Sequence, residues 1–313
     1  MTRALKAWER FWFAPQPTST LAIFRIAFGL VALAWTLALA PDLLTFYSRD
    51  GVVPRQPEFG SLRALWTWGL LSGAPGDAVV VGLFVVLLVA CACVVVGYRT
   101  RLASAGVFVG LVSFQRRDPF VLNAGDALIR LTALYLALAP AGVSLSLDRL
   151  RTARDRFWEF PARAPWALRM VQIQLSVLYV STVLEKLGGE TWRDGTAASY
   201  ALRLEDFQHL ALPTTITGSA VVSAVLTYGT LAVELSVGLL VWSRRARPFV
   251  VVPAILLHVL IDATIVAGLF SATVLTAFVA FVEPETANRW IANARERASR
   301  TGRALETGFP RLR

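Results

Sequence analysis

Residues 170–204 read MVQIQLSVLYVSTVLEKLGGETWRDGTAASYALRL, and this stretch decides how the chain is interpreted. A segment dominated by apolar residues leads to Lys186, and two glycines then precede a Trp-Arg-Asp-Gly sequence. The chain has two lysines, Lys6 and Lys186, and its other 29 basic residues are arginines. Burial can shift the pKa of a lysine, whereas arginine stays charged. Lys186 is therefore the first candidate functional residue.

The composition is that of an integral membrane protein. Of its 313 residues 56% are hydrophobic, and the mean hydropathy is +0.57, values that soluble domains rarely reach. The net charge of +10 could suggest a nucleic-acid-binding protein. The basic residues instead fall between apolar segments, which is a topology signal, and no aromatic-basic module accompanies them. We therefore expect a lipid bilayer as the chain's environment and no nucleic acid as a partner.

The apolar segments predict an all-α, polytopic transmembrane helical bundle of about eight spans. The third and the last two segments are short for a bilayer, so the closing pair is either a tight hairpin or partly re-entrant. The expected spans are residues 20–40, 77–97, 102–115, 126–141, 169–187, 219–242, 248–264 and 266–282.

The positive-inside rule then predicts the orientation of these spans. One alternating set of loops, which includes both ends of the chain, holds 21 of the 31 basic residues, and the opposite set holds eight. This bias places both termini in the cytoplasm, in a multi-pass protein of the cell membrane. We expect a transmembrane domain over residues 1–285 and a basic cytoplasmic tail over residues 286–313.

Two long loops fall on the outer side of this topology. Residues 41–76 carry aromatics and alternating charges and are expected to form a small cap on the membrane surface. The second loop covers residues 188–218, and within it residues 199–210 have the pattern of a short interfacial amphipathic helix. The tail after residue 283 has the helical spacing and arginines of a basic helix lying against an anionic inner leaflet.

Polar residues inside or beside the spans are candidate functional residues, because charges there are costly. Counting about 1.5 Å per residue places Asn123 and Asp126 at the outer mouth of the fourth span, level with Lys186. His258 lies near mid-depth in the seventh span, and Asp262 follows one turn above it. These five residues are expected to line one cavity that opens outward.

Two pairs of charges are expected to be structural. Asp126 and Arg130 are spaced to form an intrahelical ion pair. Arg25 and Glu234 lie in the inner halves of the first and sixth spans and are expected to pair with each other.

Each candidate also has a plainer interpretation. Lys186 at the end of a span can extend to the lipid headgroups, and Trp192 can be an ordinary interfacial aromatic. His258 is either an interhelical hydrogen-bonding residue or, with Asp262 four residues on, an oriented acid or base. No metal site is expected, because the two histidines of the chain, His209 and His258, have no ligand spacing.

Five blocks, in order, resemble the HTTM family, the membrane domain shared by vitamin K-dependent gamma-carboxylase and many prokaryotic proteins. The resemblance covers roughly residues 15–285. The blocks are TSTLAIFRIAFGLV (18–31), RRDPFVLNAGDALIRL (116–131), LAPAGVSLSLDR (138–149), VLYVSTVLEKLGGETWRDGTA (177–197) and LLHVLIDATIVAGLFSATVLTAFVAFVEPE (256–285).

The resemblance implies a catalytic role for Lys186, which falls where the carboxylase has the lysine that deprotonates reduced vitamin K. That chemistry needs a lysine that is neutral at the working pH. The chain departs from the carboxylase in three respects. Asp126 stands where the carboxylase has a histidine, Glu185 precedes Lys186 in place of a second lysine, and the large extramembrane region is missing.

Two hypotheses follow. In the first, a gamma-carboxylase-like enzyme uses reduced vitamin K, menaquinol or another lipophilic quinol, with Lys186 as base and His258 as a second catalytic residue. Asn123, Asp126, Trp192 and Asp262 would then bind the cofactor. In the second, the chain is a non-catalytic partner for maturation or export of a secreted peptide or protein, which binds through the two outer loops. A transporter ranks third, because no internal repeat is visible.

Overall fold

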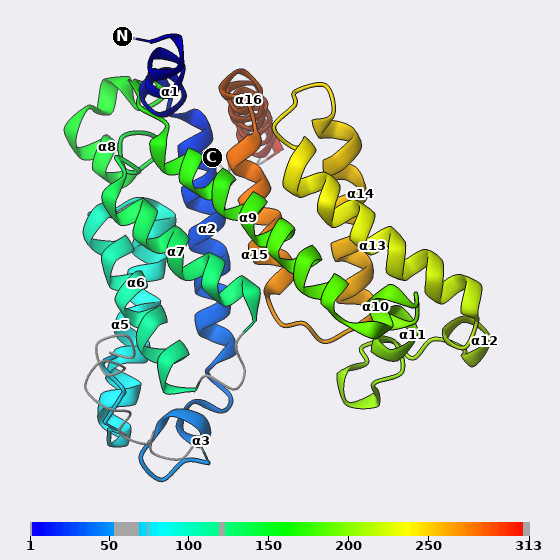
Figure 1. Cartoon of the computed structure of the whole chain (residues 1–313). Coiled ribbons are helices and arrows are strands. Elements are labelled where there is room, and N and C mark those ends of the chain that lie inside the picture. The colour runs from blue at the N-terminus through cyan, green and yellow to red at the C-terminus, as the bar shows by residue number, and fades with distance from the viewer. Residues whose placement is uncertain (1, 53–68, 74, 119–122, 309–313) are drawn as a thin grey trace.

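The computed structural model describes residues 2–52, 69–73, 75–118 and 123–308, with side chains as far as residue 300. Its described part is a helical bundle (Figure 1), which confirms the all-α prediction. A two-residue antiparallel pairing joins β1 (Gln16–Pro17) to β2 (Ala162–Arg163). The principal helices are α2 (Ser19–Ala38), α5 (Asp77–Val96), α6 (Thr100–Arg117), α7 (Ala124–Leu138), α9 (Trp166–Gly188), α13 (Ala220–Leu240), α14 (Arg247–Thr264) and α15 (Phe270–Phe278).

These eight helices occupy the eight segments expected to be spans. By length and composition, α2, α5, α9, α13 and α14 are apolar enough to cross a membrane. The other three helices fall short of that standard. α6 ends in Arg116 and Arg117, α7 has 15 residues, and α15 with its 3-10 extension η3 (Val279–Phe281) ends after 12 residues. The chain is thus a multi-pass helical protein, and the full count of eight crossings stays a prediction.

The bundle has two flanks that meet at α15. On one flank α2 packs against α5, α5 against α6, and α6 against α7. On the other, α9 packs against α13 and α13 against α14 (Figure 1). α15 contacts α2 and α7 as well as α9 and α14, so this short helix joins the two flanks at the centre.

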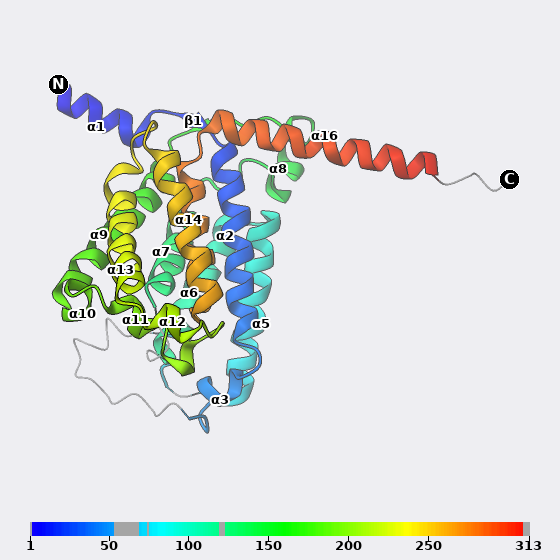
Figure 2. The same ribbon diagram turned by 90° about the vertical axis from the view of Figure 1, so that its right-hand side faces the viewer.

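Both ends of the described chain lie at the same end of the bundle (Figure 2). α1 (Arg3–Phe13) and α16 (Pro284–Gly308) extend sideways there, across the direction of the long helices. α16 confirms the helical tail expected after residue 283. The opposite end carries α3 (Leu43–Tyr47), α10 (Glu190–Arg193), α11 (Ala197–Ala201), η2 (Glu205–Phe207) and α12 (Thr214–Thr217).

The predicted helix over residues 199–210 is wrong. α11 ends at Ala201 and η2 is a separate short turn. Its second half pairs with the end of α14 instead, because the N–H of His209 donates to the carbonyl of Thr264 and the N–H of Val266 donates to that of Phe207. Before α11, Ser223 and Thr227 of α13 donate to the carbonyl of Gly195, which takes a φ of +74° that suits glycine. Residues 53–68 and 74 of the cap expected over residues 41–76 lie outside the described residues, and the described part of this segment includes α3 and its flanks.

Arg25 of α2 is completely buried and binds the backbone beyond the end of α7. Its terminal nitrogens donate to the carbonyls of Ala141 (3.2 Å), Ser144 (3.3 Å) and Leu145 (2.6 Å). Gly97 in the α5–α6 turn approaches so closely that a Cβ there would lie 2.5 Å from the Arg25 guanidinium. One cation thus connects α2, the α5–α6 turn and the loop between α7 and α8 (Leu147–Thr152).

We expect Arg25→Met to lower the free energy of unfolding by about 3 kcal/mol, because three buried carbonyls lose a charged donor at once. The measurement is the thermal midpoint of the purified protein in neutral detergent, followed by tryptophan fluorescence. Arg154→Met, at an exposed arginine near α8, is the matched control. Equal midpoints for the two variants would contradict this assignment.

Candidate functional site

Lys186 forms an ion pair with Glu234 inside the bundle. Its Nζ lies 2.5 Å from Oε1 of Glu234, and the two side chains are 20% and 9% exposed. The Lys186 ammonium also lies over the indole of Trp192, with Nζ 4.6 Å from the ring centroid, a cation–π distance. The second carboxylate oxygen of Glu234, Oε2, is buried and has no hydrogen-bond partner.

The local sequence explains how these three groups meet. α9 ends at the glycine pair, and the chain turns at Gly189 into α10, which brings Trp192 back onto the last turn of α9. On α13, Gly238 lies one turn beyond Glu234. A Cβ at Gly238 would be 2.7 Å from a methyl group of Val180, so its absence lets α13 approach α9 closely.

The expected pairing of Arg25 with Glu234 is wrong. Arg25 binds carbonyl oxygens, and Glu234 binds Lys186. The sequence-based estimate of depth placed Glu234 too far from Lys186. In the structure α9 packs against both α7 and α13, and the ion pair joins α9 to its neighbour α13 (Figure 1).

A second polar cluster lies deeper and couples three helices. The hydroxyl of Tyr179 on α9 is 2.8 Å from Nε2 of His258 on α14, and Nδ1 of His258 is 3.1 Å from the hydroxyl of Ser271 on α15. The Ser271 hydroxyl donates to the carbonyl of His258, so Nδ1–H is the donor to Ser271 and Nε2 accepts from Tyr179. His258 is 2% exposed. The residues that orient its imidazole are Tyr179 and Ser271, whereas Asp262 is exposed, which corrects the expected His258–Asp262 pair.

α9 carries its buried polar side chains at intervals of seven residues. Gln172, Tyr179 and Lys186 lie on one face of this helix, about 10 Å apart along its axis. Gln172 donates to the carbonyl of Ala280, 2.7 Å away. Tyr179 was not identified as a site residue from sequence, although its spacing from Lys186 was a usable signal.

Asn123 and Asp126 have structural contacts at the start of α7. The Asn123 side chain accepts from the N–H of Gly125, and Asp126 accepts from the N–H of Asn123, which forms a capping box. The other carboxylate oxygen of Asp126 accepts from the indole of Trp35 on α2, at 2.8 Å. The predicted Asp126–Arg130 ion pair is wrong, because Arg130 donates to the side chain of Gln115 instead.

A cavity of about 290 Å³ lies at this end of α7. Asn123 and Asp126 line it, together with Trp35 and Phe270, but Lys186 and His258 are not among its lining residues. The single cavity expected for all five residues is therefore divided. The Phe270 ring centroid is 5.4 Å from that of His258, so Phe270 contacts both the cavity and the second polar cluster.

A family model described as the HTTM domain matches residues 13–286 of the chain. This range begins within α1 and ends within α16, so it includes all eight principal helices and both polar clusters. Neither the curated proteins nor the solved structures contain a significant match to the chain.

We expect Lys186→Met to destabilise the protein by about 3 kcal/mol, because it leaves a buried carboxylate without its cation. Lys186→Met combined with Glu234→Gln should recover most of that loss. The measurement is a double-mutant cycle on the thermal midpoint in neutral detergent. Additive effects of the two substitutions would show that the ion pair does not form.

Proposed function

The chain belongs to the HTTM domain family, and we propose that it removes a proton from a lipophilic quinol at Lys186. The observation that carries this proposal is the unpartnered oxygen of Glu234 beside the Lys186 ammonium. A buried carboxylate oxygen without a donor is costly, and a hydroxyl group of a bound molecule would satisfy it. The proposed substrate class is a reduced vitamin K or a menaquinol.

The surroundings of Lys186 suit such a molecule. Trp192 offers an indole face at the same place, and aromatic rings stack on indoles. Leu184 and Leu187, on either side of Lys186 along α9, are 65% and 46% exposed, so an apolar molecule dissolved in the bilayer can reach the site sideways. The ring and the polyprenyl chain of a quinol need these two environments together.

The proposed step is a proton transfer. The Lys186 amine in its neutral form takes the hydroxyl proton of the quinol and becomes an ammonium, so the ion pair with Glu234 in the structure would correspond to the protonated state that follows the transfer. Tyr179 and His258 act as positioning residues, since they fix α9 against α14 and α15. We assign Asn123 and Asp126 to the cap of α7 and give them no part in the proton transfer.

We expect the purified protein in nanodiscs to consume oxygen when supplied with menaquinol, above the rate of empty nanodiscs. The quinolate left by the proton transfer would give two electrons and its remaining hydroxyl proton to dissolved oxygen and become the quinone, and the oxygen, with the proton returned from Lys186, would become hydrogen peroxide. Lys186→Met with Glu234→Gln, the pair that keeps the fold, should lower this rate at least 100-fold, as expected for loss of a general base. Glu185→Gln, at the exposed neighbour, should leave the rate unchanged. A wild-type protein that oxidises neither menaquinol nor reduced vitamin K would overturn the proposal.

A second candidate function is binding of a secreted peptide or protein, without catalysis. The loop between α10 and α12 exposes large apolar side chains beside the site, which favours a binding surface. If the folded wild-type protein oxidises no quinol, binding of a secreted peptide or protein remains as the candidate function. The side chains are Tyr200 (57% exposed), Leu204 (54%), Phe207 (54%) and Leu210 (57%).

We further propose that the end of the bundle with α1 and α16 faces the cytoplasm of the cell, as the charge bias predicts. Single cysteines placed at Arg154 and Asp206, both exposed, test this after replacement of Cys91 and Cys93 by alanine. A membrane-impermeant maleimide should label Asp206→Cys on intact cells and Arg154→Cys only after permeabilisation. The reverse pattern would refute the orientation.

A further inference from the structure

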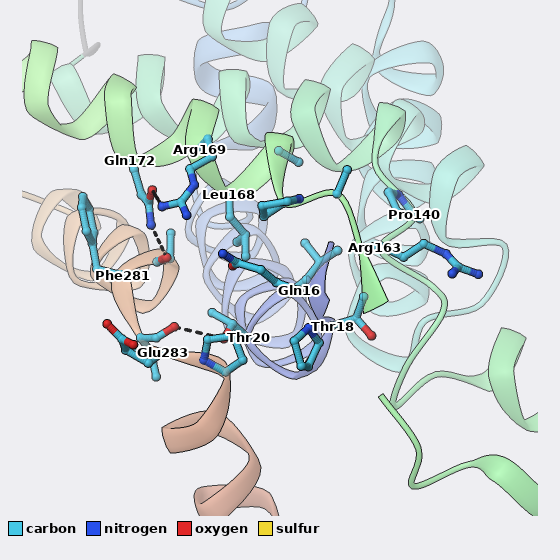
Figure 3. A pocket seen from close by; sticks show the side chains of 18 of the residues that line it. Gln16, Thr18, Thr20, Pro140, Arg163, Leu168, Arg169, Gln172, Phe281 and Glu283 are labelled. Atoms are coloured by element: carbon cyan, nitrogen blue, oxygen red, sulfur yellow. Dashed lines mark hydrogen bonds between the residues drawn. The ribbon is translucent and has the colours of Figure 1, made fainter. Parts of the chain in front are cut away.

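A cavity of about 180 Å³ at the α1–α16 end of the bundle has an excess of positive charge. Four arginines line it, and they come from the segments before α9 and α14 and from the starts of those helices. Glu283 supplies the one carboxylate among the lining residues. Figure 3 shows Arg169 and Gln172 on one wall and Glu283 on another. The arginines are Arg163, Arg169, Arg244 and Arg247.

A single carboxylate oxygen is shared between two of these arginines. Oε1 of Glu283 lies 2.8 Å from Arg244 and 3.2 Å from Arg247. Arg169 lies within electrostatic range of Arg244, Arg247 and Glu283. Its own hydrogen bonds go to neutral oxygens, those of the Phe11 backbone and the Gln172 side chain. The cluster therefore holds more cations than its one anion neutralises.

Helix starts add to this positive potential. The N-terminal ends of α2, α9, α14 and α16 all contribute lining residues, and no acidic residue lies in the first turns of α2, α9 or α14. Each helix N-terminus carries a partial positive charge and free backbone N–H groups. Together with the guanidinium groups, these ends favour an anion in the cavity.

The position of the cavity indicates which anion. α1 and α16 extend sideways at this level, and α1 exposes Trp8 (61%) and Phe13 (56%), as helices do that lie in a membrane interface (Figure 2). The outer face of α14 carries exposed apolar side chains in the turns that follow Arg247, among them Phe249 (81% exposed) and Val252 (55%). A phosphate held here would therefore sit at headgroup depth with acyl chains along α14.

We propose that this cavity binds the phosphate headgroup of an anionic phospholipid. The guanidinium groups of Arg169, Arg244 and Arg247 would hold the phosphate, and the exposed apolar face of α14 would contact the acyl chains. Such a lipid would fix the α13–α14 turn against α9 and the start of α16, because the lining residues come from all of these elements.

The test uses the full chain in neutral detergent, titrated with dioctanoyl phosphatidylglycerol, with dioctanoyl phosphatidylcholine and with inorganic phosphate. The readout is the rise in thermal midpoint, from which an apparent dissociation constant follows. We expect saturable stabilisation by phosphatidylglycerol, and weaker effects of phosphatidylcholine and inorganic phosphate. Equal stabilisation by phosphatidylcholine, or by inorganic phosphate alone, would overturn the assignment to an anionic lipid.

Three variants make the test specific to the cavity. Arg244→Gln should weaken phosphatidylglycerol binding about fivefold, the effect of one exposed charged contact, and Glu283→Gln should strengthen it, since it removes the neutralising anion. Arg245→Gln is the matched control, because Arg245 is exposed in the same turn and does not line the cavity. Equal weakening by Arg244→Gln and Arg245→Gln would show only general attraction of anionic lipid, and would refute the site.

Discussion

The burial of one cation, Arg25, constrains how this bundle can be built. A guanidinium inside a membrane domain must find acceptors, and this one finds three backbone carbonyls that lie beyond the end of α7. Those carbonyls are free because α7 has ended, and Gly97 leaves room for the guanidinium on the other side. The terminal nitrogens of Arg25 and the carbonyls beyond α7 thus satisfy each other's hydrogen-bonding requirements. These bonds hold α2 against the α5–α6 turn and the loop after α7.

The two flanks of the bundle use their polar groups differently. Around α2 and α7, Arg25, Asp126 and Gln115 each bind backbone groups or neighbouring helices, so their charges serve the fold. Along α9, the polar side chains face α13, α14 and α15. The Tyr179–His258–Ser271 cluster is satisfied within the protein, and Lys186 with Glu234 is not fully satisfied. The flank around α9 thus contains a buried carboxylate oxygen without a hydrogen-bond partner, whereas the polar groups named around α2 and α7 bind one another or the backbone.

The sequence alone predicted the helical class and the eight helical segments, because apolar runs are visible without tertiary information. It also made Lys186 a candidate site residue, because an isolated charge is visible in the same way. It did not predict which charges pair. Glu234 was predicted to pair with Arg25 because the two residues were placed at equal depth. Pairing depends instead on which helices are neighbours, and α13 is a neighbour of α9. The predicted helix over residues 199–210 failed for a related reason, since Gln208 pairs with Ile265 at the end of α14, a tertiary contact that the local helical pattern does not reveal.

The unpartnered oxygen of Glu234 bears on function more directly than the ion pair itself. An ion pair satisfied at every atom would be consistent with a purely structural role. Within the described part of the chain, Oε2 of Glu234 is the one carboxylate oxygen that is buried and has no hydrogen-bond partner. Glu234 pairs with Lys186, one of the two lysines of the chain, and the Lys186 ammonium lies over the indole of Trp192. A donor from outside the protein would complete this arrangement, and in our proposal that donor is the hydroxyl of a quinol from the lipid phase.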